Sequence, residues 1–467
     1  MKNLLFVLCL ITLLPARMTT AQAVAPEQAV RCHVVSPLPG TIATEADQRT
    51  EANYCAIDFA SPSVALCPKL WSTSPAMLVY DLVSTQWADN AAGFEAEICA
   101  RGTRARKETG GELAMFKNSV NGRETSGTFA PASLLYYHLS RLLQTRLQVP
   151  VSVVAEFPVG QYRQRVVLPG LRHSKDSTHL KMLYAGWMEM DGALSAPQAY
   201  ADRRELFTAD GASLWGVLLM NTGRRYGPEM NGTRVSGWGD GQNRDFQKTA
   251  PFIALRTDLP LAEAISAAVT EARLDPALAE ALPAEISLSQ VAWWMGEVSE
   301  IVLLDTILRQ QDRIGNIDYE WQWLWADEGV VKRSKRQPES QHAVRIRTSW
   351  LNDNDAGVRN SYANYAQRTS MLDDWHHMAP GLYRRLQLLA QDLALNGEVA
   401  RAIRQNYRLS SSQAEGVIRR AMQAAAQLRK RCQQKLLRFD LSPAATLLPH
   451  KAVDEAVDCN APGPATP

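Results

Sequence analysis

The N-terminal segment limits how this chain can fold, because it predicts export from the cytosol. Lys2 precedes the apolar run LLFVLCLITLLP, and the residues AQA at 21–23 have the small-x-small pattern that signal peptidase recognises. We therefore expect residues 1–23 to be a signal peptide, cleaved after Ala23, and the mature protein to be secreted or periplasmic. The apolar run is too short for a stable membrane anchor, and no later run of about 18 uninterrupted apolar residues occurs, so we expect no membrane-spanning segment.

Export permits disulfides, and the cysteines fall into two groups. Removal of the leader takes Cys9 and leaves six cysteines. An even number in an exported chain indicates up to three disulfides. The first group is Cys32, Cys55, Cys67 and Cys99, and the second is Cys432 and Cys459. We expect pairing within each group, and a zinc cluster is disfavoured because the chain has no C-x-x-C pair.

The charge balance excludes one class of partner. The chain has 50 Lys and Arg residues against 48 Asp and Glu residues, and the leader contains Lys2 and Arg17 but no acid. The mature chain is therefore formally neutral. Neutrality argues against bulk nucleic-acid binding.

The pattern along the chain predicts an α+β protein that is β-rich first and mostly helical later. Residues 24–75 lack sustained periodicity and are interpreted as a disulfide-tied N-terminal arm. Residues 76–165 combine strand-like runs with the helical run YYHLSRLLQTRL and the β-branched run VPVSVVAEFPV. Residues 166–440 are mostly helical, with an irregular insertion at about 172–260 and short strands between 313 and 360. Residues 441–467 form a C-terminal tail.

Three short motifs contain groups suited to phosphoryl transfer. Lys117 ends an expected strand, Asp312 follows a hydrophobic helix in QDRIGN, and Asp353 follows a β-branched strand in NDNDAG. Phosphoryl transfer requires a cation on the phosphates, a carboxylate for the acceptor hydroxyl and oxygen ligands for a divalent metal. We therefore assign Lys117 to the non-transferred phosphates and Asp312 to the acceptor proton. Asn316 and Asp353 are assigned to the metal.

Each motif alone also has an ordinary structural explanation. A lysine at the end of a strand is usually a surface residue, Asp-Arg after a helix is usually a local ion pair, and NDNDAG is typical of a turn capped by Asx side chains. The order and separation of the three motifs favour phosphoryl transfer over these explanations. Gly110 and Gly111, which precede the strand of Lys117, are included as candidate nucleotide contacts.

Two longer runs resemble a known family of kinases. The run ASLLYYHLSRLL at 132–143, followed by VP at 149–150, resembles a helix and strand of the secreted Golgi casein kinase family, and LLDTILRQQDRIGNIDYE resembles its catalytic helix and loop. The Asp-Arg…Asn theme also occurs in HipA-like kinases and type II phosphatidylinositol 4-kinases, whose Asp-Asn-Gly metal motif is similar to Asp353-Asn354. The resemblance covers about 105–395, with the middle unmatched.

The resemblance implies a two-lobed atypical protein-kinase-like fold, with a small β-rich N-lobe at 76–165 and a mostly helical C-lobe at 166–440. It also implies an exported kinase that uses ATP or another nucleotide, with Mg²⁺ or Mn²⁺, to phosphorylate a hydroxyl of a protein, glycan or lipid. Asp355 competes with Asp353 as the metal ligand, because Asp-Ala-Gly is also similar to a kinase metal turn. We favour Asp353.

The chain departs from the family pattern at two positions. Ser133 stands where the family's helix has the glutamate that pairs with the nucleotide lysine or the metal, and Glu124 is the candidate substitute. Asn316 lies four residues after Asp312 instead of five. A pseudokinase that acts as a binding or scaffolding module is therefore an alternative.

A stripe of tryptophans suggests a different class of function. Trp321, Trp323 and Trp325 alternate in an expected strand and so face one side of it. Core packing is the default explanation, but exposed rings would form a platform for sugars. The second alternative is therefore an exported carbohydrate-binding protein.

Overall fold

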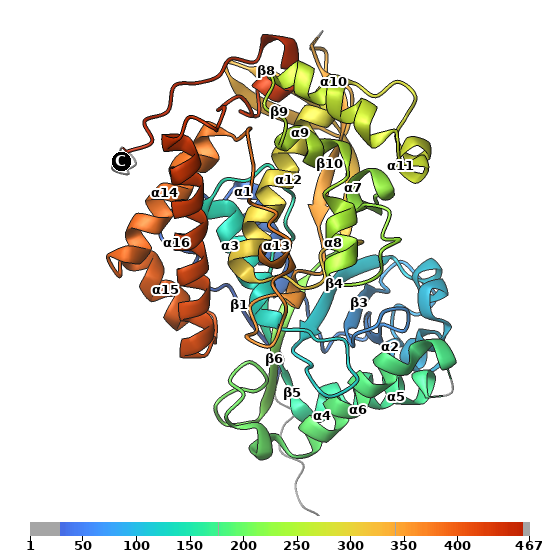
Figure 1. The fold of residues 1–467 in the computed structure, drawn as a ribbon. Coiled ribbons are helices and arrows are strands. Elements are labelled where there is room, and N and C mark those ends of the chain that lie inside the picture. The colour runs from blue at the N-terminus through green and yellow to red at the C-terminus, as the bar shows by residue number, and fades with distance from the viewer. Residues whose placement is uncertain (1–28, 176, 341, 461–467) are drawn as a thin grey trace, which may run out of the picture.

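The computed structural model describes residues 29–175, 177–340 and 342–460, so the predicted signal peptide lies outside the described residues. Figure 1 shows two regions, which we call the sheet part (29–219) and the helical part (220–460). The sheet part lies below in this view and holds the blue to green elements. The long helices of the helical part lie above and to the left.

The sheet part is organised around one antiparallel sheet with the strand order β1-β5-β6-β4-β3-β2. Its strands are β1 (Arg31–His33), β2 (Val64–Pro68), β3 (Met77–Asp81), β4 (Gly111–Asn118), β5 (Val153–Pro158) and β6 (Ser213–Leu219). The strand that carries Lys117, β4, lies in the middle of this sheet between β6 and β3. A side chain at its end is therefore held by neighbours on both sides.

The sheet begins earlier and ends later than the sequence analysis predicts. Strands β1 and β2 fall within 24–75, expected to be an arm, and β6 falls within 172–260, expected to be an irregular insertion of the C-lobe. Both β2 and β6 are buried at every residue. A strand covered on both faces shows an apolar run instead of a period-2 alternation, so a short one is easily missed. The sheet part therefore extends to Leu219 and not to residue 165.

Short helices cover the sheet. They are α1 (Glu45–Cys55), α2 (Ala91–Glu97), α3 (Ala130–Leu142), α4 (Val159–Tyr162), α5 (Leu168–Ser174) and α6 (Lys181–Ser195), with a π-helix at Arg163–Val167 and 3-10 turns at Cys99–Glu108, Thr178–Leu180 and Pro197–Tyr200. Helix α3 is buried from Ala130 to Ser140 because it packs between the sheet and the helical part. His138 on this helix shares a hydrogen bond of 2.6 Å with Tyr407 and is a core residue.

Helix α12 forms the centre of the helical part (Figure 1). The helices are α7 (Pro228–Asn231), α8 (Asp240–Phe246), α9 (Ala250–Leu255), α10 (Leu261–Ala272), α11 (Pro276–Ala281), α12 (Leu288–Leu308), α13 (Tyr365–Arg368), α14 (Pro380–Ala394), α15 (Glu398–Asn406) and α16 (Ser411–Gln433), with 3-10 turns at Asn354–Ala356, Ala445–Leu447 and Pro449–Lys451. Helix α12 is buried from Gln290 to Leu308. Its sequence is mostly apolar on every face, as suits a helix surrounded by protein, and its few acids are buried.

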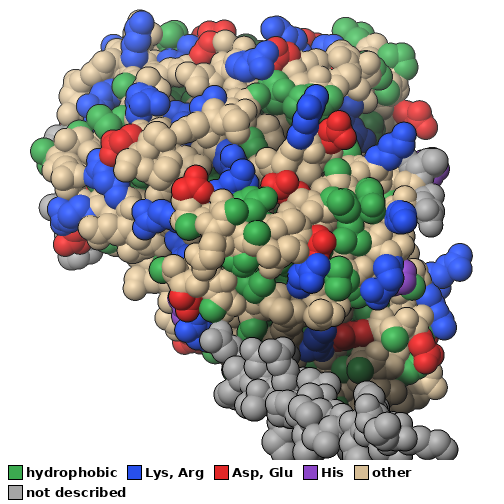
Figure 2. Space-filling model, turned by 90° about the horizontal axis from the view of Figure 1, so that it is seen from below, with side chains coloured by type: hydrophobic (Ala, Val, Ile, Leu, Met, Phe, Trp, Pro, Cys, Tyr) green, Lys and Arg blue, Asp and Glu red, His purple; other side chains and the backbone are tan. Residues whose placement is uncertain are grey.

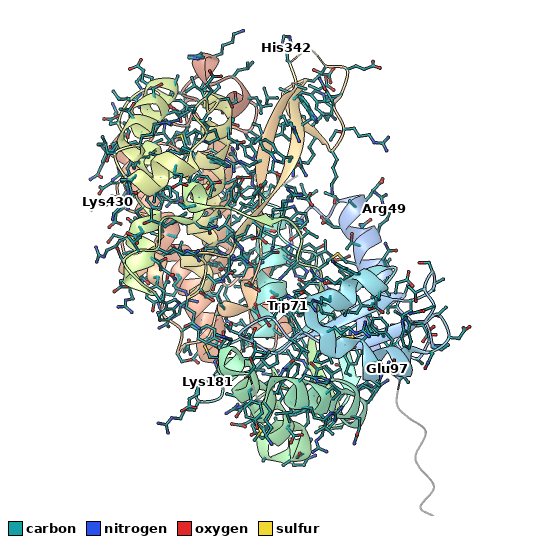
Figure 3. The ribbon with its side chains drawn as sticks, turned by 90° about the vertical axis from the view of Figure 1, so that its right-hand side faces the viewer. Arg49, Trp71, Glu97, Lys181, His342 and Lys430 are labelled. Carbon is teal, nitrogen blue, oxygen red and sulfur yellow. A yellow bond between two sulfur atoms is a disulfide. The ribbon has the colours of Figure 1, made fainter. Side chains whose placement is uncertain are left out.

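A second, smaller antiparallel sheet lies beside α12. It contains β7 (Arg224–Arg225), β8 (Ile317–Asp327), β9 (Val330–Ser334) and β10 (Val344–Leu351), with β8 paired to the other three. The strands expected between 313 and 360 are therefore present, and the first residues of the run VKRSKRQPESQ belong to β9. Figure 3 shows that His342, in the loop between β9 and β10, lies at the far tip of this sheet.

The three disulfides follow the predicted grouping. Cys32 pairs with Cys55 and Cys67 with Cys99 in the sheet part, and Cys432 pairs with Cys459 in the helical part. Such bridges are typical of proteins in an oxidising compartment outside the cytosol. Among the described residues, no helix combines the length and apolarity needed to cross a bilayer. Figure 2 shows basic and acidic side chains interspersed over one face, in keeping with the balanced charge.

A buried carboxyl on α12 predicts how stability depends on pH. Glu297 is fully buried and accepts hydrogen bonds from the Ser349 amide (2.7 Å), the Ser349 hydroxyl (2.6 Å) and the Trp293 indole (2.8 Å). Burial outweighs these bonds and raises the pKa of Glu297 to about 7 from 4.5. A raised pKa stabilises the fold below the unfolded value, and this contribution disappears as pH rises through the folded value.

Glu297→Gln should therefore flatten the pH dependence of unfolding. Between pH 4.5 and 7 the native protein should lose about 3 kcal/mol through this carboxyl, at ~1.4 kcal/mol per pH unit. The glutamine retains an acceptor oxygen and has no charge to bury. Urea unfolding at pH 5 and pH 8 measures the difference, with the exposed Glu45→Gln as control. Equal pH slopes in native protein and Glu297→Gln would contradict the assignment.

Candidate functional site

The candidate site is centred on Lys117, which binds two carboxylates from the helical part. The side chain is 4% exposed, and Nζ donates to Asp353 Oδ1 at 2.7 Å and to Asp355 Oδ1 at 2.9 Å. Burial alone would lower the pKa of Lys117, but the two carboxylates raise it above its usual value. The predicted lysine of the first motif and the predicted acids of the third therefore meet, although more than 200 residues separate them.

The loop that carries Asp312 begins where α12 ends. Arg309 adopts a left-handed conformation (φ 54°, ψ 51°), which reverses the chain after Leu308. The backbone then bonds to the segment of Asp353 and Asp355: the Gln311 amide donates to the Ala356 carbonyl at 3.0 Å. The loops that contain these two predicted motifs are consequently hydrogen-bonded to each other, next to Lys117.

Arg313 fixes the relative position of these two loops. Its guanidinium is buried, forms an ion pair with Asp305 of α12 at 3.1 Å, and donates to the Asn352 carbonyl at 2.6 Å and to Asn354 Oδ1 at 2.8 Å. The ordinary explanation of the Asp312-Arg313 sequence was a local ion pair. Arg313 does form an ion pair, but with Asp305. Asp312 is left outside that pair.

Asp312 lies in the electrostatic field of the same cluster. Its backbone amide donates to the side chain of Gln310 at 3.0 Å, which sets the direction of the loop. Burial, together with the nearby Asp353 carboxylate, raises the pKa of Asp312 above its usual range. A carboxylate with a raised pKa is a better proton acceptor than an exposed one, because basicity increases with pKa.

The two candidate metal ligands differ in their surroundings. The Asp353 side chain is 33% exposed and that of Asp355 is 3% exposed. Burial opposes the ionisation of Asp353, yet Lys117 and Lys69 hold its pKa below the usual value. Asp355 Oδ2 is buried without a hydrogen-bond partner among the described residues. Asp353 is thus the more accessible ligand, and Asp355 mainly neutralises Lys117.

The residues fit a divalent cation only in part. Over the described ranges, no three Asp, Glu, His or Cys side chains converge as a metal site. Magnesium, however, is commonly held by one or two carboxylates together with substrate phosphates and water. Asp353 meets this requirement. Asn316 does not in this conformation, because Oδ1 accepts from Arg225 at 2.6 Å while Nδ2 donates to the Asp312 carbonyl at 2.7 Å.

Three predicted nucleotide contacts are not brought to Lys117. Gly110 and Gly111 lie at the opposite end of β4, where the Gly110 amide donates to the Asp81 carbonyl. Gly111 lies six positions before Lys117, which corresponds to about 20 Å of extended strand. Glu124 is exposed in the loop before α3 and has no ion pair with Lys117. Ser133 is buried on α3, and its hydroxyl has no partner among the described atoms.

Sequence reasoning missed three charged residues near the cluster. Lys69 follows β2, and burial together with the Lys117 ammonium lowers its pKa. Asp318 pairs with Arg225 at 2.6 Å and accepts from the Asn352 side chain at 2.7 Å. Figure 3 shows Trp71, two residues after Lys69, between the two parts of the molecule. Of these residues, only Lys69 has a sequence signal that could have suggested its place near the cluster, because it directly follows a buried strand.

The tryptophan stripe lies on the outer side of β8. Trp321 is 44% exposed, while Trp323 and Trp325 are half-buried. Arg345 lies 4.8 Å from the Trp321 ring centre, and Arg347 lies 5.8 Å from it. Arginines therefore already contact the ring that a sugar would need.

Comparison with known proteins does not assign the chain to a family. No protein-family model matches it, and no curated protein shows significant sequence similarity to it. The class of protein must therefore be inferred from the fold and the site.

Proposed function

We propose that this chain is an exported, metal-dependent phosphotransferase of the atypical kinase type, which transfers a phosphoryl group from a nucleotide such as ATP to a hydroxyl of a protein, glycan or lipid. The observation that favours this function most is the buried Lys117 in contact with Asp353 and Asp355, with Asp312 beside them. Protein kinases likewise combine a strand lysine, a metal-binding aspartate and a separate aspartate that accepts the proton of the substrate hydroxyl.

Each residue has one task in the proposed reaction. Lys117 binds the phosphates that are not transferred, and Asp312 accepts the proton of the acceptor hydroxyl. Asp353 would hold Mg²⁺ or Mn²⁺, and the metal would supply positive charge to neutralise the phosphates. Arg313 positions Asp353 by binding the backbone of Asn352 and the side chain of Asn354.

Asp355 explains how this site works without a glutamate on α3. In protein kinases a helix glutamate orients the nucleotide lysine through an ion pair. Here Ser133 stands at the position of that glutamate on α3, and Lys117 instead pairs with the buried Asp355 at 2.9 Å. The Asp355 backbone carbonyl also accepts a hydrogen bond from the Phe129 amide at the start of α3 (2.7 Å). Asp355 is therefore held next to the helix on which protein kinases carry the glutamate.

A thermal shift with nucleotide and Mn²⁺ tests the binding half of the proposal. We expect the native protein to gain several degrees in Tm with both ligands present and less with either alone, because the metal and the phosphates bind jointly. Asp353→Asn should lose the joint effect. The control is Asp258→Asn, which changes an exposed carboxylate. No shift in the native protein, or an equal shift in both variants, would refute the proposed nucleotide site.

A pseudokinase is the second candidate, and one contact favours it. The side-chain oxygen Oδ1 of Asn316, a predicted metal ligand, accepts a hydrogen bond from Arg225 at 2.6 Å. A scaffold of this kind would act as a binding module without holding nucleotide and metal together. It is distinguished by the absence of a thermal shift with nucleotide and Mn²⁺ and by no transfer of phosphate to any acceptor.

A further inference from the structure

Four arginines converge on a cavity beside the C-terminal end of α12. The cavity has a volume of about 740 Å³, and its lining includes Arg309, Arg368, Arg419 and Arg420. In the described part of the chain, the lining contains no carboxylate. The segment 361–368 forms one wall and α16 the other. A cavity of this size matches a small-molecule site, and its charge matches an anion.

The arginines of this cavity are mostly unpaired. Arg368 forms an ion pair with Asp240 at 2.7 Å, but within the described residues Arg309, Arg419 and Arg420 have no carboxylate within ion-pair distance. A comparable cavity of about 730 Å³ beside α1 differs in this respect. There, Arg141 pairs with Asp47 and Arg146 with Glu300, and Arg333 is the one lining arginine without an ion pair among the described residues. Of these two cavities, the one beside α12 therefore presents several unneutralised guanidinium groups and the one beside α1 a single one.

Arg420 shows that these charges interact with one another. It is 6% exposed, its Nε donates to the Ile307 carbonyl at 2.7 Å, and its Nη2 has no hydrogen-bond partner among the described residues. Burial, together with the neighbouring Arg309 and Arg419, lowers the pKa of Arg420 to about 10. A buried cation with an unpartnered donor costs free energy unless an anion is supplied.

We infer that this cavity binds a phosphate group, either as inorganic phosphate or as the phosphate of a small phosphomonoester such as a sugar phosphate. Guanidinium groups bind phosphate through two parallel hydrogen bonds, which makes arginine the preferred residue for such a site. The neutral side chains of Ser361, Gln367 and Gln423 also line the cavity and suit the hydroxyls of a sugar. The site is separate from Lys117 and does not depend on the proposed transferase activity.

Thermal shift and calorimetric titration with sodium phosphate and with glucose 6-phosphate, against sodium chloride of equal ionic strength, test the inference. No nucleotide or metal is added, so the result does not depend on the proposed kinase activity. We expect a Tm rise of a few degrees in the native protein with at least one of the two anions. A larger effect of the ester identifies a sugar phosphate, and an equal effect identifies inorganic phosphate. No response to either anion overturns the inference.

Two variants locate the binding. Arg419 is exposed on α16, so Arg419→Glu should fold normally and bind the anion at least tenfold more weakly. Arg401→Glu makes the same charge change on the exposed side of α15 and should bind as the native protein does. Arg420→Met should also lose the response. Equal binding by Arg419→Glu and Arg401→Glu, whether retained or lost in both, overturns the assignment, and so does retained binding in a folded Arg420→Met protein.

Discussion

Replacing Lys117 by methionine should lower the free energy of unfolding by about 3–5 kcal/mol at pH 7, because it leaves buried carboxylates without their cation. Methionine fills the space of the lysine stem, so the loss comes from charge and not from a cavity. Asp353 and Asp355 would then face each other, with Lys69 and Arg225 as the remaining cations that act on Asp353. Urea unfolding of the native and variant proteins at pH 7 measures the effect.

The pH dependence of this effect has a definite sign. In the native protein the pKa of Asp353 lies below its ordinary value of 3.8, so its ionisation stabilises the fold above that pH and the contribution is lost in acid. The difference between native protein and Lys117→Met should therefore be largest above about pH 5 and shrink toward pH 3. The double variant Lys117→Met/Asp355→Asn should regain part of the loss.

A surface lysine provides the matched control. Lys248 is 58% exposed, and its partner Asp245 keeps hydrogen bonds from the Ser236 amide and hydroxyl, so Lys248→Met should cost at most about 1 kcal/mol. If Lys117→Met costs no more than Lys248→Met, the cluster does not have the electrostatic role assigned to it.

Asp312→Asn should slow phosphoryl transfer by about 10²- to 10⁴-fold, the range attributed to a general base. Asparagine has nearly the same shape and cannot accept the proton. The nucleotide-dependent thermal shift should persist, because Asp312 is not assigned to the nucleotide or the metal. Single-turnover transfer from a γ-labelled nucleotide, to the protein itself or to an added acceptor, measures the rate.

The pH profile and a second variant identify the role of Asp312. Because burial and Asp353 raise the pKa of Asp312, the native rate should decline with acidity at a higher pH than an ordinary aspartate would cause. Asp240→Asn, which removes a partly exposed carboxylate paired with Arg368, should transfer at the native rate. Equal rates in native protein and Asp312→Asn would exclude Asp312 as the base.

The residues that were predictable stand where a regular pattern ends. Lys117 lies at the end of β4, Asp312 after α12 and Asp353 after β10, and in each case a periodic apolar run stops at a polar residue. The grouping of the cysteines was predictable because sequence distance limits which partners meet, whereas the pairing among the first four was left open. Helices α12, α14 and α16 were predictable because their length and apolar content leave few alternatives.

The partnerships were not predictable, because they depend on how the two parts of the molecule pack. The choice of Asp355 as the second partner of Lys117 follows from the 2.7 Å bond that ties its backbone to the start of α3. The engagement of Asn316 by Arg225 follows from the two-residue strand β7, which has no pattern of its own. Strand β6 was missed for the related reason that burial on both faces removes alternation.

Each of the three disulfides joins cysteines of the same part, two in the sheet part and one in the helical part. The bridges therefore stiffen each part internally and leave their relative rotation to non-covalent contacts. Among these contacts are the ion pairs of Lys117 with Asp353 and Asp355, which join the sheet part to the helical part. If Lys117 binds phosphate as proposed, the phosphate would compete with these two ion pairs, and binding would then loosen the contact between the two parts.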